Sequence, residues 1–483
     1  MGSLTRLAAL LLPCLALLAA APHAGAGSRP PACDLLDSPQ AAYISGGGLI
    51  LLQNECRDAP RVQPAAVEHP SPATTSAAFN GTDLLLNDPS SDQPPATTQS
   101  ETAIEACGET RIAAWNDSGS VAHSSFTGYA RSVDSGVTWT DRGHFAGLTG
   151  SDPALASDAA CRFYFSAATF AGGCSRIGVV RSDDGGLTWS APANASPGVS
   201  CDNFQDKETI KADATAGPHA GNLYACWDDR GSSEIRVLFS LSTDGGRIFS
   251  EPLTVSSFPF GYATGCQVAV GPGGEVTLVW TDGLTLGLYS RVSTDGGQSF
   301  GPATPIAASQ IIGAFRDCGG SYRPLLNGDI RAFNWPALAV NPQNGHLHVA
   351  WNDNRSGNPD VYYSRSADMG AHWSAPVRLN HDSGTTDQFQ PALAFTGSGV
   401  LRAIWYDRRL DPAANYLIDV FSTVSVNDGV KFAPDQRITD VSFGVPPTNP
   451  NFDPNVVACY MGDYIGITGG QEAHYMVWGD NRN

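Results

Sequence analysis

The sequence predicts an all-β fold: a β-propeller of four-stranded antiparallel blades, with seven blades favoured and six as the alternative. Three observations support this prediction. No segment of the 483 residues shows sustained helical periodicity. Short runs rich in β-forming residues, such as "GEVTLVW" and "GHLHVAW", are bounded by Gly, Asn and Asp. Two interleaved phrases recur at intervals of about 50 to 70 residues, a period typical of propellers and solenoids.

The first element is a predicted signal peptide over residues 1–26. It has one positive charge at Arg6, the apolar core "LAALLLPCLALLAAA" and a plausible cleavage site, "AGA". Residues 27–98 form an N-terminal arm that is partly rich in Pro, Ala and Thr, and residues 99–483 carry the repeats. No later apolar run is long enough to span a membrane. The sequence therefore predicts secretion, to the cell exterior or the periplasm.

Cysteine usage and charge narrow the function. Removal of Cys14 with the signal peptide leaves ten cysteines, an even number that predicts disulfides in an exported chain. There is no CxxC pair, Walker loop, EF-hand loop or H-E-x-x-H motif, so neither a cofactor nor a metal is expected. A formal net charge of −19 disfavours nucleic acid as a partner. The expected partner is a glycan or glycoconjugate, bound by a monomer.

The first repeated phrase reads S-x-D-x-G-x-x-aromatic and predicts a hairpin turn. The Asp accepts hydrogen bonds from turn N–H groups, the Gly takes a positive φ, and the aromatic ring covers the hairpin. Five good copies and a degenerate sixth, "SVNDGVKF", occupy residues 132–139, 182–189, 242–249, 293–300, 366–373 and 425–432.

The second phrase, W-x-D, ends a predicted strand ahead of each hairpin. Six copies end at Asp117, Asp229, Asp282, Asp353, Asp407 and Asp480. A seventh copy has decayed to "RFYFSA" near Phe165, and each unit divides into four strands. The last unit has only two strands, so we expect "AAFNGTDLLLND" in the N-terminal arm to supply the missing outer strands. In the six-blade alternative, this last pair caps the ring.

The hairpin phrases resemble the Asp boxes, or bacterial neuraminidase repeats, of the sialidase superfamily, and the resemblance covers about residues 99–483. It implies that the boxes lie at turns between third and fourth strands, away from the active site, so the repeats are scaffold. It also implies three arginines for a substrate carboxylate, a Tyr–Glu nucleophilic pair and an Asp acid/base. The first of these arginines normally lies in an F/Y-R-I-P phrase, but the corresponding strand reads "SETAIEAC". Its absence counts against authentic sialidase activity.

Candidate site residues lie where the blades differ, at the starts of the first strands. If these strands line the axis, their heads converge on one central cavity. Candidate catalytic residues are Tyr464, Glu208, Glu101, Asp152 and Asp463. Candidate substrate-binding residues are Lys207, Trp335, Asp387 and Gln390, together with Arg355, Arg409 and Arg482 at the ends of second strands. A purely structural role remains an alternative for each group. Lys207 and Glu208 can tie blades together, Tyr464 can be a packed aromatic, and the arginines can pair with Asp between blades.

The sequence thus favours a secreted, sialidase-like glycoside hydrolase acting on glycans. One alternative is a non-catalytic propeller that binds glycan or protein. Another is a polysaccharide lyase with a Tyr or His base and a cation for a uronate. An arginine cluster with a Tyr–Glu contact would favour the hydrolase, and a flat face of Asp–Arg pairs would favour the binding module.

Overall fold

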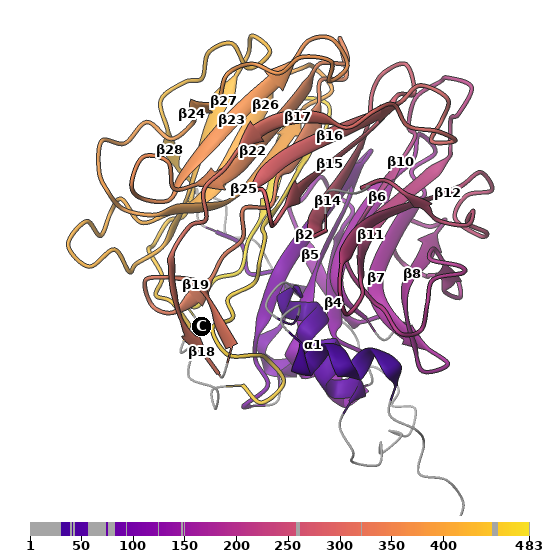
Figure 1. Ribbon diagram of the computed structural model, residues 1–483, viewed down its shortest axis with the longest axis horizontal. Helices are drawn as coiled ribbons and strands as arrows, with labels where there is room; N and C mark the ends of the chain where they lie inside the picture. The colour runs from indigo at the N-terminus through magenta and orange to yellow at the C-terminus, as the bar shows by residue number, and fades with distance from the viewer. Residues whose placement is uncertain are drawn as a thin grey trace, which may run out of the picture.

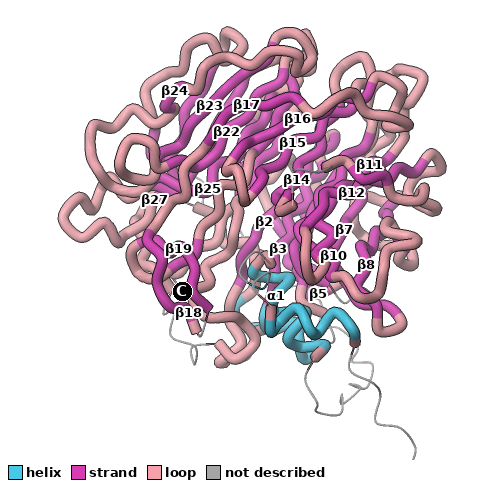
Figure 2. Tube along the Cα trace, in the orientation of Figure 1, coloured by secondary structure: helices cyan, strands magenta, loops and turns pink. Residues whose placement is uncertain are grey.

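The computed structural model describes residues 30–38, 41, 44–56, 74–75, 83–92, 94–123, 125–145, 148, 150–256, 261–319, 321–446 and 453–482. The predicted signal peptide lies outside these residues. The described chain is almost entirely strand and loop, with helix α1 and its 3-10 neighbour near the N-terminus as the main exception (Figures 1 and 2). The predicted propeller of four-stranded antiparallel blades is confirmed.

Six sheets are full blades, and in each the chain runs from the innermost strand outwards. The first has β2 (Gln99–Cys107), β3 (Thr110–Asp117), β4 (Thr127–Ser132) and β5 (Trp139–His144), with β1 (Thr74–Thr75) at its outer edge. The second has β6 (Gly150–Ser157), β7 (Phe163–Ala171), β8 (Cys174–Ser182) and β9 (Ala193–Asn194). The third has β10 (Phe204–Ala212), β11 (Leu223–Arg230), β12 (Ile235–Ser242) and β13 (Leu253–Thr254).

The remaining blades follow the same order. The fourth has β14 (Ala263–Val270), β15 (Val276–Asp282), β16 (Gly287–Ser293) and β17 (Thr304–Ala308). The fifth has β21 (Ala337–Val340), β22 (Leu347–Asp353), β23 (Asp360–Ser366) and β24 (Val377–Arg378). The sixth has β25 (Gln388–Phe395), β26 (Leu401–Asp407), β27 (Asp419–Ser425) and β28 (Gln436–Arg437). A small sheet of β18 (Ala314–Cys318), β19 (Ser321–Leu326) and β20 (Ile330–Arg331) is inserted between the fourth and fifth blades.

A two-stranded sheet, β29 (Gly466–Gly469) and β30 (His474–Val477), closes the ring. β29 lies between β25 of the sixth blade and β2 of the first, and the other innermost strands contact one another in chain order. The N-terminal arm adds β1 to the first blade, where it pairs with β5, and not to β30. The described part of the expected closing segment, residues 83–88, contains no strand, and residues 77–82 lie outside the described chain. The count of seven blades stays a prediction.

The two repeated phrases hold the blades together. Five of the six W-x-D tryptophans are buried, and Trp478 is half-buried. The indole N–H of Trp351 donates to Asp353 at 2.9 Å and that of Trp405 to Asp407 at 2.7 Å, whereas that of Trp227 donates to Gln205 at 2.6 Å. In all six hairpin phrases the Ser hydroxyl donates to the Asp or Asn side chain and accepts the Gly N–H. All six lie between third and fourth strands.

The predicted disulfides are confirmed, and all ten cysteines pair. The pairs are Cys33–Cys56, Cys107–Cys161, Cys174–Cys201, Cys226–Cys266 and Cys318–Cys459. The first closes a hairpin of the 3-10 helix η1 (Pro31–Asp37) and α1 (Gly46–Glu55), which packs against β6, β7 and β10. Two shorter 3-10 helices are η3 (Pro89–Ser91) and η4 (Ser118–His123). No helix in the described chain has both the length and the apolar character needed to cross a bilayer.

Candidate active site

The innermost strands are kinked at one equivalent position. Glu101, Asp152, Lys207 and Gln390 have φ of 52°, 60°, 52° and 52°, in the left-handed region. At these places the pairing with the second strand shifts register, as in a β-bulge. A left-handed residue other than Gly costs about 1–2 kcal/mol, and such strain persists where the surrounding structure requires it, commonly at functional sites.

We call the cluster at these kinks the hub, and it comprises Glu101, Asp152, Asp206, Lys207, Glu208, Asp463 and Tyr464. Glu101 and Asp152 are both buried. Asn116 on β3 bridges them, because its Nδ2 donates to Glu101 Oε2 at 2.6 Å and its Oδ1 accepts the Asp152 N–H at 2.8 Å. Burial raises the pKa of Glu101 well above its usual value, and the charge of Asp152 adds to this. Burial also raises the pKa of Asp152, while its hydrogen bond with Glu101 opposes the rise. Both carboxyls of the pair are thus shifted towards the protonated form, Glu101 more strongly than Asp152.

Lys207, Glu208 and Tyr464 form the second part of the hub. Lys207 Nζ lies 3.9 Å from the centre of the Tyr464 ring and 5.4 Å from that of Trp335. Neither oxygen of buried Glu208 has a hydrogen-bond partner among the described residues. Burial raises the pKa of Glu208 well above the usual range, and the charge of Asp152 adds to the effect. Burial, followed by the charges of Asp152, Glu101 and Glu208, likewise raises the pKa of Tyr464.

Asp463 anchors the third part. Arg331, on β20 of the inserted sheet, donates from Nε to Asp463 Oδ1 at 3.0 Å. Trp335 stacks on Phe333, with ring centres 4.2 Å apart. Gln390 donates from Nε2 to the carbonyl of Gly462 at 2.7 Å, next to Asp463. The structure thus brings together the five candidate catalytic residues with Lys207, Trp335 and Gln390.

The N-terminus of helix α1 occupies the hub. The Ser45 N–H donates to Asp206 Oδ2 at 2.8 Å, and the Ser45 hydroxyl lies 2.6 Å from Asp206 Oδ1 and also contacts Asp152, so the two carboxylates share its proton. The Gly46 N–H donates to Asp463 Oδ2 at 2.6 Å. The first N–H groups of a helix have no partner within it and carry partial positive charge, so they match these carboxylates.

The other candidates lie in local ion pairs. Asp387 pairs with Arg408 at 3.0 Å. Arg355 and Arg409 each bind the Asp two residues before them, Asp353 and Asp407. These short-range pairs lie within one blade, because the Asp of the same turn is the nearest carboxylate. Arg482 binds Asp480, Asp83 and Asp440, the last of which follows the sixth blade. Each of the three arginines is thus paired with its own set of carboxylates.

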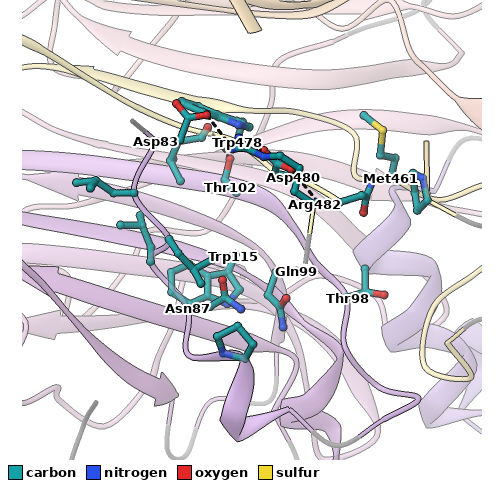
Figure 3. Close-up of a pocket in the computed structure, with 18 of the residues that line it drawn as sticks. Asp83, Asn87, Thr98, Gln99, Thr102, Trp115, Met461, Trp478, Asp480 and Arg482 are labelled. Carbon is teal, nitrogen blue, oxygen red and sulfur yellow. Dashed lines mark hydrogen bonds and ion pairs between the residues drawn. The ribbon is translucent and has the colours of Figure 1, made fainter. Parts of the chain in front are cut away.

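A groove of about 930 Å³ lies at the seam between the first blade and the two-stranded sheet. Trp115, Trp478 and Met461 line it, and Arg482 meets Asp83 and Asp480 at its edge (Figure 3). Of the hub residues, none is among its lining residues. The groove runs beside β30 where a full blade would continue with two more strands, so its position reflects the incomplete sheet. The buried titratable side chains lie in the hub and not in this groove, and the N-terminus of α1 fills the interior of the hub. No group of three or more His, Cys, Asp or Glu side chains in the described chain is arranged to hold a metal ion.

Sequence reasoning missed three components of the hub. Asn116 is the middle residue of a W-x-D phrase, and this middle position varies between blades, a signal that could have singled it out. Arg331 lies in the inserted sheet, which the sequence repeats do not predict. Residues 45–48, "SGGG", fall within the arm that the sequence predicts to supply strands. The departure from the repeat is the only sequence signal for the last two.

No protein-family model and no curated protein matches the chain. Among solved structures, it is similar to the Hadza microbial sialidase Hz136, at 13% identity and a TM-score of 0.44, over 73% of this chain and 71% of that one. It is also similar to the GH93 α-L-arabinofuranosidase of Fusarium graminearum, at 15% identity and a TM-score of 0.44, over 71% and 96%. A leech intramolecular trans-sialidase has 13% identity and a TM-score of 0.45, over 65% of each chain. At these identities the similarity concerns the fold alone.

Proposed function

We propose that this protein is an exported glycoside hydrolase whose active centre is the hub. The observation that carries the proposal is the buried pair Glu101 and Asp152, which Asn116 bridges and in which burial raises the pKa of both carboxyls, that of Glu101 further. Glycoside hydrolysis requires one carboxyl that donates a proton and another group that acts as base or nucleophile. Environments that push two carboxyls apart in pKa mark such a pair.

Five of the seven hub residues receive a role in the reaction. Glu101 donates its proton to the leaving glycosidic oxygen, and Asp152 then takes a proton from the attacking water. In the sialidase-type route, Tyr464 attacks the anomeric carbon as the glycosidic bond breaks, and Glu208 accepts the phenol proton. The water activated by Asp152 then breaks the bond between Tyr464 and the sugar, and Glu208 returns the proton to the phenolate. Glu208 supports this role because both of its oxygens are buried without a hydrogen-bond partner in the described chain, so either can receive the phenol proton. The Lys207 ammonium over the Tyr464 ring stabilises the phenolate.

The charges at the hub favour a neutral sugar as the substrate. A substrate carboxylate needs unengaged arginines for bidentate binding. Arg331 is bound to Asp463, and buried Arg230 is bound to Asp206 at 2.6 Å and Asp228 at 2.8 Å. The rim arginines are paired as well. Buried Arg323, near Arg331, has Nε and Nη1 without a hydrogen bond in the described chain, which leaves one such arginine and not the three of a sialidase-type site. The missing F/Y-R-I-P phrase agrees with this substrate class.

A second function, a non-catalytic glycan-binding propeller, is favoured by one specific observation. Asp152, Asp206 and Asp463 already accept hydrogen bonds from the tip of α1. A permanently filled hub would leave only the outer faces and the seam groove for binding. The lyase is not proposed, because the arrangement that would favour it, Arg or Lys beside His and Tyr in an open groove, differs from the hub, where Lys207 is buried.

The test is a hydrolysis screen on aryl glycosides and oligosaccharides of neutral sugars, with sialosides and uronate-containing glycans in parallel. We expect turnover on neutral sugars, and Glu101→Gln and Tyr464→Phe to lower kcat at least about 100-fold. Glu105→Gln is the matched control, since Glu105 lies on the same strand but contacts Ser157 and Lys211 outside the hub. Absence of turnover on every substrate would favour the binding propeller.

A further inference from the structure

We propose that residues 45–48, at the start of helix α1, form an intramolecular plug that occupies the sugar position of the hub and inhibits the protein until it is displaced. This inference rests on the proposed function. The plug is the tip of the hairpin closed by Cys33–Cys56. It reaches the centre of the ring from outside the repeats, since no blade contains it.

The plug uses the acceptors that a sugar would use. The Ser45 hydroxyl contacts both Asp206 and Asp152, and two backbone N–H groups donate to Asp206 and Asp463. Sugar hydroxyls are donors of the same kind, and carboxylates accept strong charge-assisted hydrogen bonds from them. A glycan cannot reach these three carboxylates while Ser45 and Gly46 hold them.

The fit also depends on shape. A Cβ at Gly47 would lie 2.0 Å from Asp152 Oδ1 and 2.3 Å from Asn116 Nδ2. At Gly46 it would lie 1.7 Å from a Tyr460 ring carbon, and at Gly48 2.0 Å from Asp206 Oδ1. Glycine lowers helix stability by about 1 kcal/mol relative to Ala at an interior position. Three successive glycines therefore oppose the helix itself, and the space in the hub explains their presence.

The contacts that hold residues 45–48 in the hub can be broken without unfolding a blade. Its polar contacts are hydrogen bonds, which sugar hydroxyls or water can replace. Beyond the tip, Ile44, Leu49 and Leu52 pack against Phe204 and Tyr460, and Leu51 is buried in the core between the second and third blades, so withdrawal of the whole hairpin exposes these apolar side chains. No strand pairs with α1. Withdrawal of the hairpin thus breaks no sheet. The Cys33–Cys56 disulfide keeps η1 and α1 together as one unit.

The test uses the full chain with Gly47→Ala, which removes the space for the plug and changes no hub side chain. Amide hydrogen exchange at Ser45 and Gly46 should accelerate, and kcat/KM on the neutral substrate should rise at least about 10-fold, because one misplaced methyl removes most of the closed population. Gln53→Ala, on the exposed face of α1, is the control and should change neither. Ser45→Ala removes the hydroxyl contacts without adding volume. If Gly47→Ala fails to fold, Ser45→Ala replaces it, and we expect smaller increases in amide exchange and in kcat/KM.

The outcomes separate the two proposals. Faster exchange with unchanged or lower activity in a folded variant would overturn the plug as an inhibitor. Unchanged exchange in folded Gly47→Ala would overturn its seating in the hub. Faster exchange with no hydrolysis by either protein would instead contradict the hydrolase. In that case, calorimetry measures the binding of a neutral oligosaccharide to the wild-type protein and to Gly47→Ala. Tighter binding to Gly47→Ala would support the plug, and equal binding would overturn it.

Discussion

At the residue scale, Glu208 combines burial with the absence of a partner. Both of its oxygens lack a hydrogen bond within the described chain, and burial with the charge of Asp152 raises its pKa. A carboxyl whose folded pKa lies above its unfolded value contributes stability below the unfolded pKa, and this contribution is lost as pH rises through the folded pKa. At neutral pH this residue therefore weakens the fold, as functional carboxyls often do.

The corresponding prediction concerns Glu208→Gln. The neutral amide should raise the free energy of unfolding at pH 7, because it removes the cost of keeping an ionisable carboxyl in this buried place, about 1.4 kcal/mol for each pKa unit between the folded and unfolded states. The gain should shrink towards pH 4, where the wild-type carboxyl is protonated in both states. Urea unfolding at the two pH values measures it. Glu105→Gln should bring no gain, since Ser157 and Lys211 already contact that carboxylate. An equal gain at both pH values would contradict a pH-linked origin.

At the element scale, the hairpin turn depends on its serine. Buried Ser182 donates to Asp184 at 2.7 Å and accepts the Gly186 N–H at 2.7 Å, linking the two ends of the turn between β8 and β9. Ser182→Ala leaves a buried N–H without its acceptor, so the free energy of unfolding should fall by about 1–3 kcal/mol. Leu187→Ala, at an exposed position of the same turn, should have little effect. Thermal unfolding compares them, and a hydrolysis rate altered by Ser182→Ala would contradict a purely structural turn.

The same scale shows what the sequence could predict. The positions of Ser182 and Asp184 recur in the six full blades, with Asn427 in place of Asp in the sixth, so their role followed from repetition and turn chemistry. The innermost strands were predictable as strands, and the residues near their starts meet at the hub, as expected. The contacts of Asn116 and Arg331 were not predictable, because each is made once and joins distant segments. Helix α1 was missed because its first residues are three glycines, which signal a loop by local propensity. Tertiary packing in the hub overrides that signal.

At the scale of the whole molecule, the shortest innermost strands decide whether the ring closes. β29 has four residues and begins and ends with glycine. A Cβ at Gly466 would lie 2.8 Å from the carbonyl oxygen of Thr102 on β2. A Cβ at Gly469 would lie 1.8 Å from the carbonyl oxygen of Phe395 on β25. The closing strand β29 is therefore packed directly against the backbones of β2 and β25, and at Gly466 and Gly469 there is no room for a Cβ atom.

Gly469→Ala tests this closure. Because the clash is with backbone and not with a flexible side chain, β29 must move away from β25, and overpacking of this kind costs about 1–3 kcal/mol. We expect a lower Tm and also lower hydrolysis, since Asp463 and Tyr464 directly precede β29. Gly470→Ala is the matched control, because the nearest atom to its Cβ would be a Tyr475 ring carbon at 3.2 Å, which can yield, and the backbone oxygen of Ala473 would lie at an ordinary contact distance of 3.5 Å. If both variants unfold at the wild-type temperature, the contact between β25 and β29 does not close the ring, and the hub must be held by the six full blades alone.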